Sequence, residues 1–438
     1  MSIGLITVLL ILSIILVFAA GFPVAFGLGC VAMLFGLMLW GPQSFYTVAT
    51  TSINTMSSFV LLAIPLFLFM GKILQGSGAG EAMFKAIHVW TGRLGGGLAI
   101  GAVIVCTFMA AMVGIIGAGI MTMGLIAIPP MFKRGYDKHL TLGAVMAGGA
   151  LGMLIPPSIC MILYSSVTAI SIGKMFSGGI MPGLILSAIY ITYIAIRCKL
   201  KPAMGPPLPP EERVSFREKI VTGKDALVAF ALIALVLGSI FGGLATPTEA
   251  AAVGAVGAIL LSVVYRKFGW KLMSDSAMET MKMTGMIMWI AIGASIFSNI
   301  YMFLGGRHLI ENIIRTLGLS PWQVIIMMQV SLILLGMIMD EFIIVLITAP
   351  LYVPVVISLG FNPVWFGVVM IVNMQIAVLT PPYGFALFYM KGVAPPGITM
   401  LDLYRSIGPF IGLQLTGLIL CMIFPEIILW LPGLIFGT

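Results

Sequence analysis

The stretch GMLIPPSICMILY, from Gly152 to Tyr164, decides the fold of this chain. It places two consecutive prolines inside an apolar run that is long enough to cross a lipid bilayer. A proline in a helix interior removes a backbone donor and clashes with the preceding turn, which costs about 3 kcal/mol or more. The stretch therefore predicts a broken membrane helix, and the break needs either a function or neighbours that tolerate it.

The composition places the chain among polytopic helical membrane proteins. Of its 438 residues, 61% are hydrophobic and only 8% are charged, and apolar runs of about 20 residues recur along it. These values exclude a soluble protein, and no alternating ten-residue pattern suggests a β-barrel. The first run, residues 1–20, lacks a positively charged start, so we interpret it as a retained span and not as a cleaved signal.

The scattered cysteines and histidines form no catalytic or metal-binding pattern. The five cysteines show no CxxC spacing, so neither a disulfide framework nor a metal site is indicated. We also find no nucleophile, histidine and carboxylate arrangement and no phosphate-binding glycine loop. The sequence therefore predicts a protein that is not an enzyme and has no cofactor, and its net charge of +8 is interpreted through membrane topology, not nucleic-acid binding.

Ten full spans and two hairpins account for the apolar segments. Residues 96–131 and 320–354 are each too long for one span and are interrupted near their centres, so each is predicted to enter and leave on the same side. The full spans are expected at residues 2–20, 23–40, 56–75, 139–171, 177–196, 226–243, 249–266, 283–304, 363–393 and 404–425. Helices lying along the membrane surface are expected at residues 77–92, 270–282 and 306–316.

The distribution of Lys and Arg predicts that both termini face the periplasm or exterior. With this orientation most basic residues fall on the cytoplasmic side, and only Lys174, Arg307 and Arg315 fall clearly outside. An excess of positive charge in the inner loops is the usual determinant of membrane orientation. The asymmetry supports the span count, both hairpins and the orientation together.

The two halves of the chain match at a fixed shift of 225 residues, which aligns Pro156 and Pro157 with Pro381 and Pro382. The other matches are Pro129 with Pro354, Gly135 with Gly360, Asp137 with Asn362, Tyr164 with Tyr389 and Gly183 with Gly408. An odd number of crossings in each half requires the second copy to be inverted. We predict a first repeat at residues 1–198, a basic, proline-rich cytoplasmic linker at 199–224 and a second repeat at 225–438.

Within each repeat, scaffold helices are expected first and the hairpin with its broken helix second. The scaffold helices occupy residues 1–95 and 225–318, and the hairpins with their broken helices occupy residues 96–198 and 319–438. Inverted repeats with broken helices at matched positions indicate a secondary transporter whose substrate and coupling ions bind near the membrane midplane.

The hairpin tips and helix breaks predict two similar cation sites, one in each repeat. The first combines residues 112–119 with 152–158, and the second combines residues 336–341 with 377–384. Freed backbone carbonyls can bind a cation, and exposed helix N-termini can bind an anion. Proline kinks that are absorbed by packing are the alternative.

Several polar side chains near these segments have two interpretations each. Asp340 is a candidate to orient the tip, balance a cation or relay a proton, or else it caps the following half-helix. Thr380 offers a hydroxyl to a hard cation such as sodium, or else it bonds back to its own helix. Glu249 is expected to lie at a helix start, and Lys391 to extend toward the inner surface, and not to contact substrate.

The sequence resembles the large membrane (M) subunit of the tripartite ATP-independent periplasmic (TRAP) transporters, the DctM-like proteins of the ion transporter superfamily. The resemblance covers nearly the whole chain. The matching stretches are GFPVAFGLG, GRLGGGLAIGAV, IPPMFKRGYDKHLTLGAVMAGGALGMLIPPSICMILYSSVT, MPGLIL, GGLATPTEAAAVGA, MDEFIIVLITAPLYVPVV and LTPPYGFALF.

This resemblance implies a sodium-coupled elevator, in which the scaffold stays still while the hairpins and broken helices carry the substrate across the membrane. It also implies two protein partners, a small four-helix membrane subunit (Q type) and a periplasmic substrate-binding protein (P type), beside membrane lipid. A chain of 438 residues has no room for the small subunit, so the unfused form is expected.

The resemblance also assigns site residues by motif. The first sodium site would use Gly114, Gly152, Ile155 and Pro157. The second sodium site would use Gly336, Ala377, Thr380 and Tyr383. The further candidates for substrate binding or coupling are Val113, Ile115, Pro156, Ser158, Asp340, Pro381 and Pro382.

The first hairpin tip departs from the pattern of the family. Many members have Ser-Gly-Ser where this chain has Val113, Gly114 and Ile115, so both hydroxyls are missing. Backbone carbonyls would remain for sodium, and substrate contacts at the tip would be more apolar. The predicted activity is import of a small organic anion, and the apolar tip slightly favours an unusual anion such as a small sulfonate. An exchanger or channel that works without a binding protein is the alternative.

Overall fold

The computed structural model describes residues 3–209, 211, 215–306, 309, 316, 318–382 and 384–437, and no strand occurs among them. The helices of the first half are α1 (Ile3–Ala19), α2 (Val24–Trp40), α3 (Gln43–Met56), α4 (Ala63–Gly76), α5 (Ala79–Thr91), α6 (Gly97–Val113), α7 (Ile116–Lys133), α8 (Lys138–Ala150), α9 (Ile159–Thr168) and α10 (Ile172–Leu200). Those of the second half are α11 (Phe216–Phe241), α12 (Pro247–Val264), α13 (Trp270–Phe303), α15 (Pro321–Gly336), α16 (Glu341–Ser358), α17 (Pro363–Leu379), α18 (Phe385–Val393), α19 (Met400–Ile423) and α20 (Glu426–Phe436).

The helical hairpins and the broken helices form where the sequence places them. Helices α6 and α7 meet at a tip centred on Gly114, and residues 337–340 join α15 to α16. In the first broken helix, a short 3₁₀ turn at Leu151–Met153 and an irregular segment separate α8 from α9. In the second, α17 ends at Leu379 and α18 begins at Phe385. Both proline pairs lie inside these breaks, and both Pro-Pro peptide bonds are cis.

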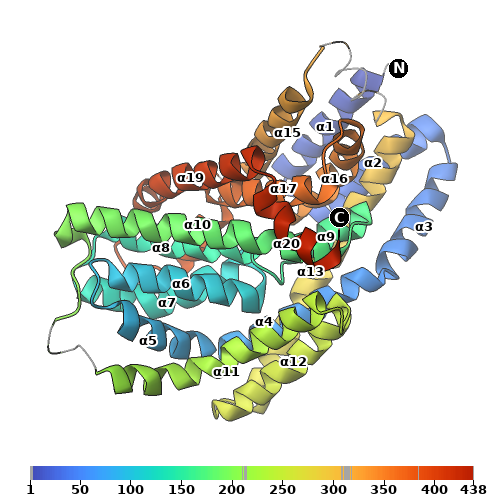
Figure 1. Cartoon of the computed structure of the whole chain (residues 1–438). Helices are drawn as coiled ribbons and strands as arrows, with labels where there is room; N and C mark the ends of the chain where they lie inside the picture. Colours follow the sequence, from blue (N-terminus) through green and yellow to red (C-terminus); the bar gives the residue numbers. More distant parts are fainter. Residues whose placement is uncertain are drawn as a thin grey trace.

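For description, the helices are divided into two packed groups, named the scaffold group and the hairpin group. The scaffold group comprises α1–α5 and α11–α13, in which α13 packs on α2, α3 and α4, and α12 packs on α4. The hairpin group comprises α6–α10 and α15–α19, in which α8 packs on α6, α7 and α19 (Figure 1). The two groups meet where α5 and α4 contact α6 and where α13 contacts α16.

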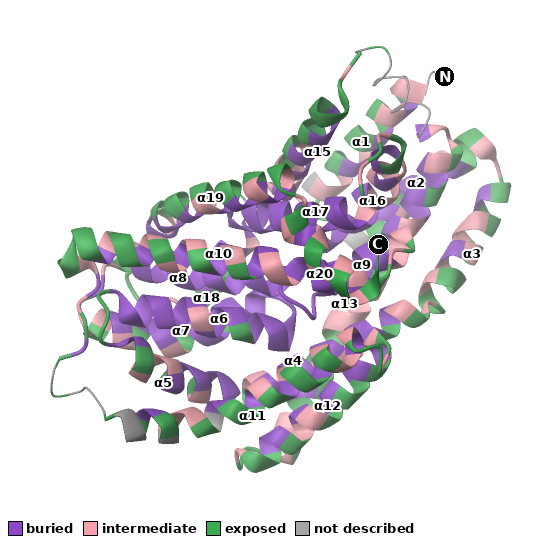
Figure 2. Cartoon of the chain, in the orientation of Figure 1, coloured by how far each residue is buried: buried purple, intermediate pink, exposed green. Residues whose placement is uncertain are grey.

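The hairpin group contains the most deeply buried helices, and the outer helices expose apolar side chains. Every residue of α17 from Val364 to Leu379 is buried, as is α8 from Leu140 to Ala150 (Figure 2). On α1 and α12, by contrast, Leu16 is 68% exposed and Leu260 is 62% exposed. Helices with such outward apolar faces require a lipid environment.

Seven described helical segments are long and apolar enough to cross a membrane, and a bent pair within α11 would make an eighth. Several other predicted spans occur as shorter apolar helices. Shorter apolar helices also border the first tip and the first break, namely α6 and α9. The chain is therefore a multi-pass membrane protein, in agreement with its composition.

Three details of the predicted helix map were wrong. Residues 270–282 are not a separate surface helix, because they continue without interruption into the next span as the 34-residue α13. The predicted span 56–75 is interrupted at Ser57 and Ser58, and the unexpected helix α3 precedes the interruption. Helix α20 was not anticipated at all. The predicted surface helix 77–92 is present as α5, whereas most of 306–316 lies outside the described residues.

The first part of the linker crosses the base of the first hairpin. Helix α10 continues to Leu200, and residues 201–208 form a strap that begins with a short 3₁₀ turn at Pro202–Met204. The backbone hydrogen bonds of this strap run from Gly96 N to Gly205 O at 2.8 Å, from Leu208 N to Gly92 O at 2.8 Å and from Asp137 N to Met204 O at 2.9 Å. The strap is therefore attached to the hairpin group before the chain enters α11.

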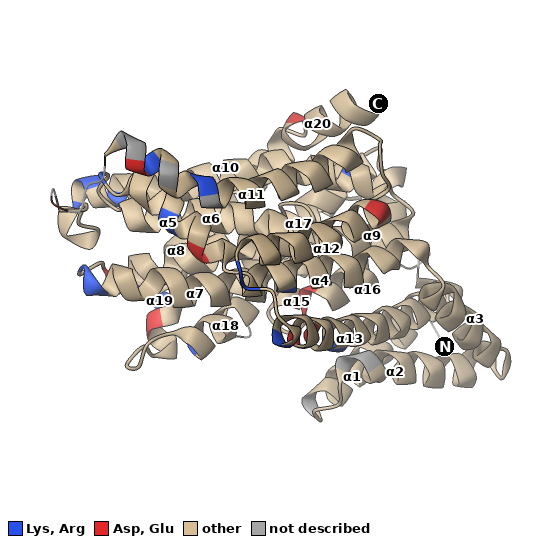
Figure 3. Cartoon of the chain, turned by 90° about the horizontal axis from the view of Figure 1, so that it is seen from below, with Lys and Arg blue, Asp and Glu red and all other residues tan. Residues whose placement is uncertain are grey.

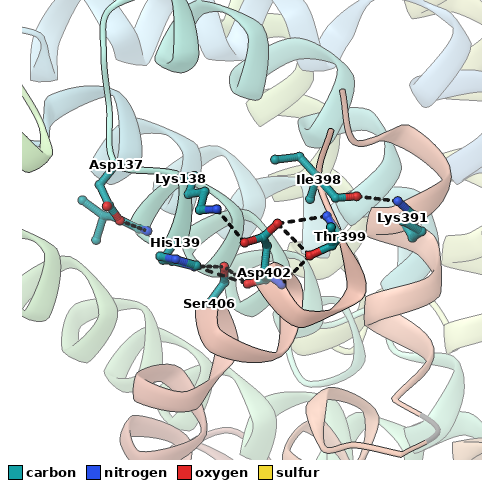
Figure 4. A network of polar contacts seen from close by, with 9 residues as sticks. Asp137, Lys138, His139, Lys391, Ile398, Thr399, Asp402 and Ser406 are labelled. Atoms are coloured by element: carbon teal, nitrogen blue, oxygen red, sulfur yellow. Dashed lines mark hydrogen bonds and ion pairs between the residues drawn. The ribbon is translucent and has the colours of Figure 1, made fainter. Parts of the chain in front are cut away.

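Basic side chains gather at the end of the hairpin group where α8 and α19 begin and α10 ends (Figure 3). Two of these helices are joined there by an ion pair between Lys138 Nζ and Asp402 Oδ1 at 2.6 Å, and Asp402 also accepts from Thr399 (Figure 4). Lys391 donates to the carbonyl of Ile398. This basic end corresponds to the side that is predicted to face the cytoplasm.

Candidate functional site

The first hairpin tip is docked directly on the first broken helix. Gly114 ends α6 with a φ of +69°, a left-handed conformation that favours glycine. A Cβ at Gly114 would lie 2.2 Å from the carbonyl oxygen of Pro157, so no side chain fits there. The backbone N–H of Ile159 approaches Gly114 O at 3.5 Å. The tip and the break that the sequence predicts as one site are therefore in contact.

The other predicted residues of the first site surround this contact but do not all face it. A Cβ at Gly152 would lie 3.0 Å from the carbonyl oxygen of Ile115, which places the tip beside the 3₁₀ turn. Ile155 instead packs its side chain against Gly183 of α10. Ser158 is fully buried, and its hydroxyl donates to Met153 O and accepts from Met161 N, so it caps α9.

Val113 and Pro156 complete the first set of candidates. Val113 is buried and its backbone lies against Gly71 of α4, where a Cβ at Gly71 would lie 2.9 Å from Val113 Cα. This contact is a boundary between the scaffold group and the hairpin tip. Pro156 is buried within the break.

The second hairpin tip meets the second broken helix in a similar way. A Cβ at Gly336 would lie 2.1 Å from the Cβ of Ala377, so α15 ends directly against the end of α17. Pro381 is half-buried and Pro382 is exposed. Tyr383, the remaining member of the predicted second site, lies outside the described residues.

Asp340 caps the half-helix that follows the tip, and its neighbour Glu341 is buried. Asp340 Oδ1 accepts a hydrogen bond from Phe342 N at 2.9 Å, which confirms the capping interpretation of this residue. Glu341 is only 7% exposed, and its Oε2 has no hydrogen-bond partner among the described residues. Sequence reasoning singled out Asp340 but missed Glu341, although the DE pair at membrane depth was visible as a signal.

Thr380 follows its structural alternative in this conformation. Its Oγ1 donates to Ile376 O at 2.6 Å, one turn earlier in α17. The hydroxyl oxygen keeps its lone pairs in this arrangement, so the bond to the helix is compatible with cation binding. Glu249 accepts from Thr246 N at 2.8 Å and forms a capping box at the start of α12, as expected.

A buried amide pair that the sequence analysis missed ties α15 to α17. The side-chain amide of Asn373 donates to Gln329 O at 2.8 Å and to Gln329 Oε1 at 2.7 Å. Both residues are almost fully buried. The only sequence signals were polar residues in two apolar runs, Gln329 in IIMMQV and Asn373 in VNMQIAVL. The pair joins α15, which ends at the second tip, to α17, which ends at the second helix break.

A cavity of about 560 Å³ opens beside both tips, between the scaffold and the hairpin group. Its volume lies within the range of small-molecule binding sites. Ile115, Met121, Met283, Phe342 and Tyr389 contribute apolar or aromatic surface to its wall. The polar and charged lining residues are Lys72, Gln75, Asp275, Ser276, Glu279, Asp340 and Glu341.

Two contacts cross or border this cavity, and neither was predictable from local sequence. Lys72 Nζ of α4 forms an ion pair with Glu279 Oε2 of α13 at 2.6 Å. Gln75 Nε2 of α4 donates to Thr122 Oγ1 of α7 at 2.8 Å, which links the scaffold group to the first hairpin. Such pairs join residues far apart in the chain, so only the tertiary fold brings them together.

A second, smaller cavity of about 250 Å³ lies between α3, α9, α13 and α16. Hydroxyl and amide groups dominate its polar lining, and no described lining residue is charged. Within it, Asn299 Nδ2 donates to Thr51 Oγ1 at 2.9 Å. The scaffold group and the hairpin group are thus separated by polar cavities at two places.

Long apolar helices, two hairpin tips docked on two broken helices and a polar cavity beside the tips are the features of a membrane transporter. The fold agrees with this class. The solved structure of the YdaH transporter of Alcanivorax borkumensis is similar to this chain with a TM-score of 0.63 and 15% sequence identity, over 90% of each chain.

The family is shown by the sequence itself. Residues 11–427 match the model of the tripartite ATP-independent periplasmic transporter, DctM component, and the chain belongs to this family. The C4-dicarboxylate TRAP transporter large permease protein DctM of Pseudomonas aeruginosa is 36% identical over 91% of this chain and 92% of the relative. The isethionate TRAP transporter permease protein DctMQ of Oleidesulfovibrio alaskensis is 32% identical over 94% of this chain and 64% of the relative.

Proposed function

We propose that this chain is the large membrane subunit of a transporter that imports a small organic anion, a carboxylate or a sulfonate, by sodium coupling. Its family supports the role as the large permease subunit. The names of two relatives, a C4-dicarboxylate transporter and an isethionate transporter, support carboxylates and sulfonates as the substrate class.

The single observation that carries the coupling proposal is the docking of each hairpin tip on a helix break. Gly114 lies against Pro157 O, Gly152 lies against Ile115 O, and Gly336 lies against Ala377. Irregular backbone of this kind at membrane depth brings carbonyl oxygens together in a protein-lined space. Sodium is a hard cation that prefers oxygen ligands. We assign the first sodium to the Gly114 and Pro157 contact and the second to the region of Ala377 and Thr380, with Tyr383.

An elevator movement of the hairpin group against the scaffold group would carry the site across the membrane. The polar cavities between the groups and the close approach of Gly71 to Val113 support a boundary that can slide. We propose that the chain works in the bacterial inner membrane with both termini in the periplasm. Its proposed partners are a Q-type small membrane subunit and a P-type periplasmic binding protein, and the fusion relative DctMQ supports the first of these.

Reconstitution tests this function directly. The chain, its small subunit and its binding protein are placed in liposomes, and uptake of labelled succinate and isethionate is measured with an inward sodium gradient and with potassium in its place. We expect substrate uptake to require both the gradient and the binding protein. Uptake that is equal in potassium would overturn the sodium coupling. Uptake by the chain and free substrate alone would favour the exchanger or channel instead.

A further inference from the structure

The cavity beside the tips has an unusual charge balance for a site that binds an anion. The charged residues that line it are four carboxylates, Asp275, Glu279, Asp340 and Glu341, and a single ammonium, Lys72. With every group ionised, this described lining would carry a formal charge of −3. A simple carboxylate or sulfonate in this cavity would lie near four acidic side chains and only one basic side chain, which disfavours its binding.

Two of the carboxylates lie on the hairpin tip and two lie on the scaffold wall. Asp275 and Glu279 are exposed side chains of α13, where water screens their charge. Glu341 differs, because it is 93% buried next to Asp340 and its Oε2 accepts no hydrogen bond from a described residue. An unpaired buried carboxylate oxygen is costly, and it is satisfied by a ligand that brings donors and positive charge.

The single lysine already has a partner that a substrate can replace. Lys72 is 17% exposed and pairs with Glu279, which is 56% exposed. Because Glu279 reaches water while Lys72 is largely covered, the pair is open on one side, and the carboxylate of Glu279 can be exchanged for the acidic group of a ligand. The cavity therefore offers one cationic contact on the scaffold and an unsatisfied anionic contact on the tip.

We propose that the substrate is a small zwitterion, an amino acid or amino sulfonate, whose ammonium group binds Glu341 and Asp340 and whose carboxylate or sulfonate binds Lys72. An ammonium supplies three hydrogen-bond donors, which match the free lone pairs of Glu341 Oε2. The methionines and Phe342 in the wall accommodate its carbon chain. This inference rests on the proposed transport function and adds an ammonium group to the carboxylate or sulfonate proposed there.

Matched ligand pairs that differ only in the charged group test this assignment. Taurine and isethionate share a sulfonate skeleton, and L-aspartate and L-malate share a dicarboxylate skeleton, so each pair exchanges an ammonium for a hydroxyl. Ligand binding is measured as the rise in melting temperature of the chain with its small subunit in lipid nanodiscs. We expect the ammonium member of at least one pair to bind ten times more tightly than its hydroxyl partner.

The variant Glu341→Gln removes the charge and keeps the shape. We expect it to reduce the preference for the ammonium member at least fivefold, whereas Glu426→Gln, which alters an exposed carboxylate at the start of α20, leaves it unchanged. Equal binding of both members, tighter binding of a hydroxyl member, or an unchanged preference in Glu341→Gln would overturn the proposal. The titrations are repeated with potassium in place of sodium, so that the zwitterion proposal is tested separately from sodium coupling. A preference for the ammonium ligand that persists without sodium supports the zwitterion proposal even if transport is not coupled to sodium.

If none of the four ligands binds, the electrostatic potential in the cavity can still be measured with charged thiol reagents, and this measurement tests the proposal. In a Cys30→Ser background, Met121→Cys places a thiol at a 40% exposed position in the cavity wall. We expect a cationic ethylammonium methanethiosulfonate to react at least ten times faster than the anionic ethylsulfonate reagent, after each rate is divided by its rate with a free thiol. In the Glu341→Gln variant, the normalised rate of the cationic reagent should fall closer to that of the anionic reagent. A normalised ratio of one or below would overturn the proposal.

Discussion

At the scale of single residues, Gly114 is the position where sequence and geometry agree most closely. Its φ of +69° costs any other residue about 1–2 kcal/mol, and a Cβ would overlap the carbonyl oxygen of Pro157. In Gly114→Ala the tip must therefore withdraw from the break. We expect the sodium concentration for half-maximal transport to rise at least tenfold, which corresponds to about 1.4 kcal/mol.

Gly135 provides the control for this substitution. It has a φ of +73°, but a Cβ there meets nothing within 4 Å. Gly135→Ala therefore introduces the same backbone strain without the contact with a helix break. If both variants change the sodium titration equally, strain alone accounts for the effect, and the contact between Gly114 and Pro157 has no role in sodium binding.

Thr380 carries the clearest side-chain prediction for the second site. Thr380→Val keeps the shape and removes the hydroxyl, so we expect half-maximal transport to require about ten times more sodium, equivalent to about 1.4 kcal/mol. The melting temperature should change no more than in Thr348→Val, which removes a similar bond from Thr348 Oγ1 to Ile344 O in α16. Thr380→Ser should restore the wild-type titration. An unchanged titration in Thr380→Val would exclude this hydroxyl from the site.

The residues that the sequence could not identify are those whose partners lie far away in the chain. Asp340 and Thr380 were recognisable from the sequence, because each places a polar group beside a tip or a helix break. Whether each side chain is free for a ligand or bonds to its own helix depends on hydrogen bonds that only the structure shows. Lys72 gave no signal, because a lysine near a helix end is ordinary. Its role became visible only in the structure, where the fold places Lys72 Nζ 2.6 Å from Glu279 Oε2.

At the scale of helices, the Asn373 and Gln329 pair holds α15 against α17. Asn373→Leu leaves the polar groups of Gln329 buried without their partner, and we expect a loss of about 1–3 kcal/mol in the free energy of unfolding. The double variant Gln329→Leu with Asn373→Leu removes both polar groups, so it should be less destabilised than the sum of the single variants. Thermal unfolding in detergent measures all three. Additive losses would show that the two side chains do not stabilise each other.

The helix breaks were predictable and the continuity of α13 was not, for different physical reasons. Pro-Pro pairs end helices through local sterics, so their positions in the sequence were sufficient. Residues 270–282 carry several charged and polar residues, which suggested a helix at the membrane surface. In the structure Asp275, Ser276 and Glu279 line a cavity, and Glu279 forms an ion pair with Lys72. The polar side chains therefore have polar surroundings, and the helix continues unbroken into the next span.

At the scale of the whole molecule, the elevator proposal predicts that the scaffold and hairpin groups must separate during transport. Gln75 and Thr122 are hydrogen-bonded across that boundary at 2.8 Å. In a Cys30→Ser background, Gln75→Cys with Thr122→Cys should therefore be joined by a short thiol-specific crosslinker. We expect the crosslinked protein to lose transport by at least tenfold and to regain it when a cleavable crosslinker is reduced.

A crosslink within one group should have no such effect. Thr107 of α6 and Ser187 of α10 have their hydroxyls 2.8 Å apart, and both helices belong to the hairpin group. The pair Thr107→Cys with Ser187→Cys is thus the matched control. Undiminished transport in the crosslinked Gln75 and Thr122 variant would contradict a sliding movement at this boundary.

The strap across the base of the first hairpin implies that α5 belongs with the moving hairpin group, and not with the scaffold group, in the proposed elevator movement. Because Gly205 and Leu208 bind Gly96 and Gly92, the end of α5 is tied to the start of α6 and would follow α6 in the proposed elevator movement. We therefore expect α5 to pivot at Gly78, which has a φ of +82° and nothing within 4 Å of a Cβ placed there. Spin-label distances should stay constant between α5 and α6 and change between α4 and α5 as the transporter cycles.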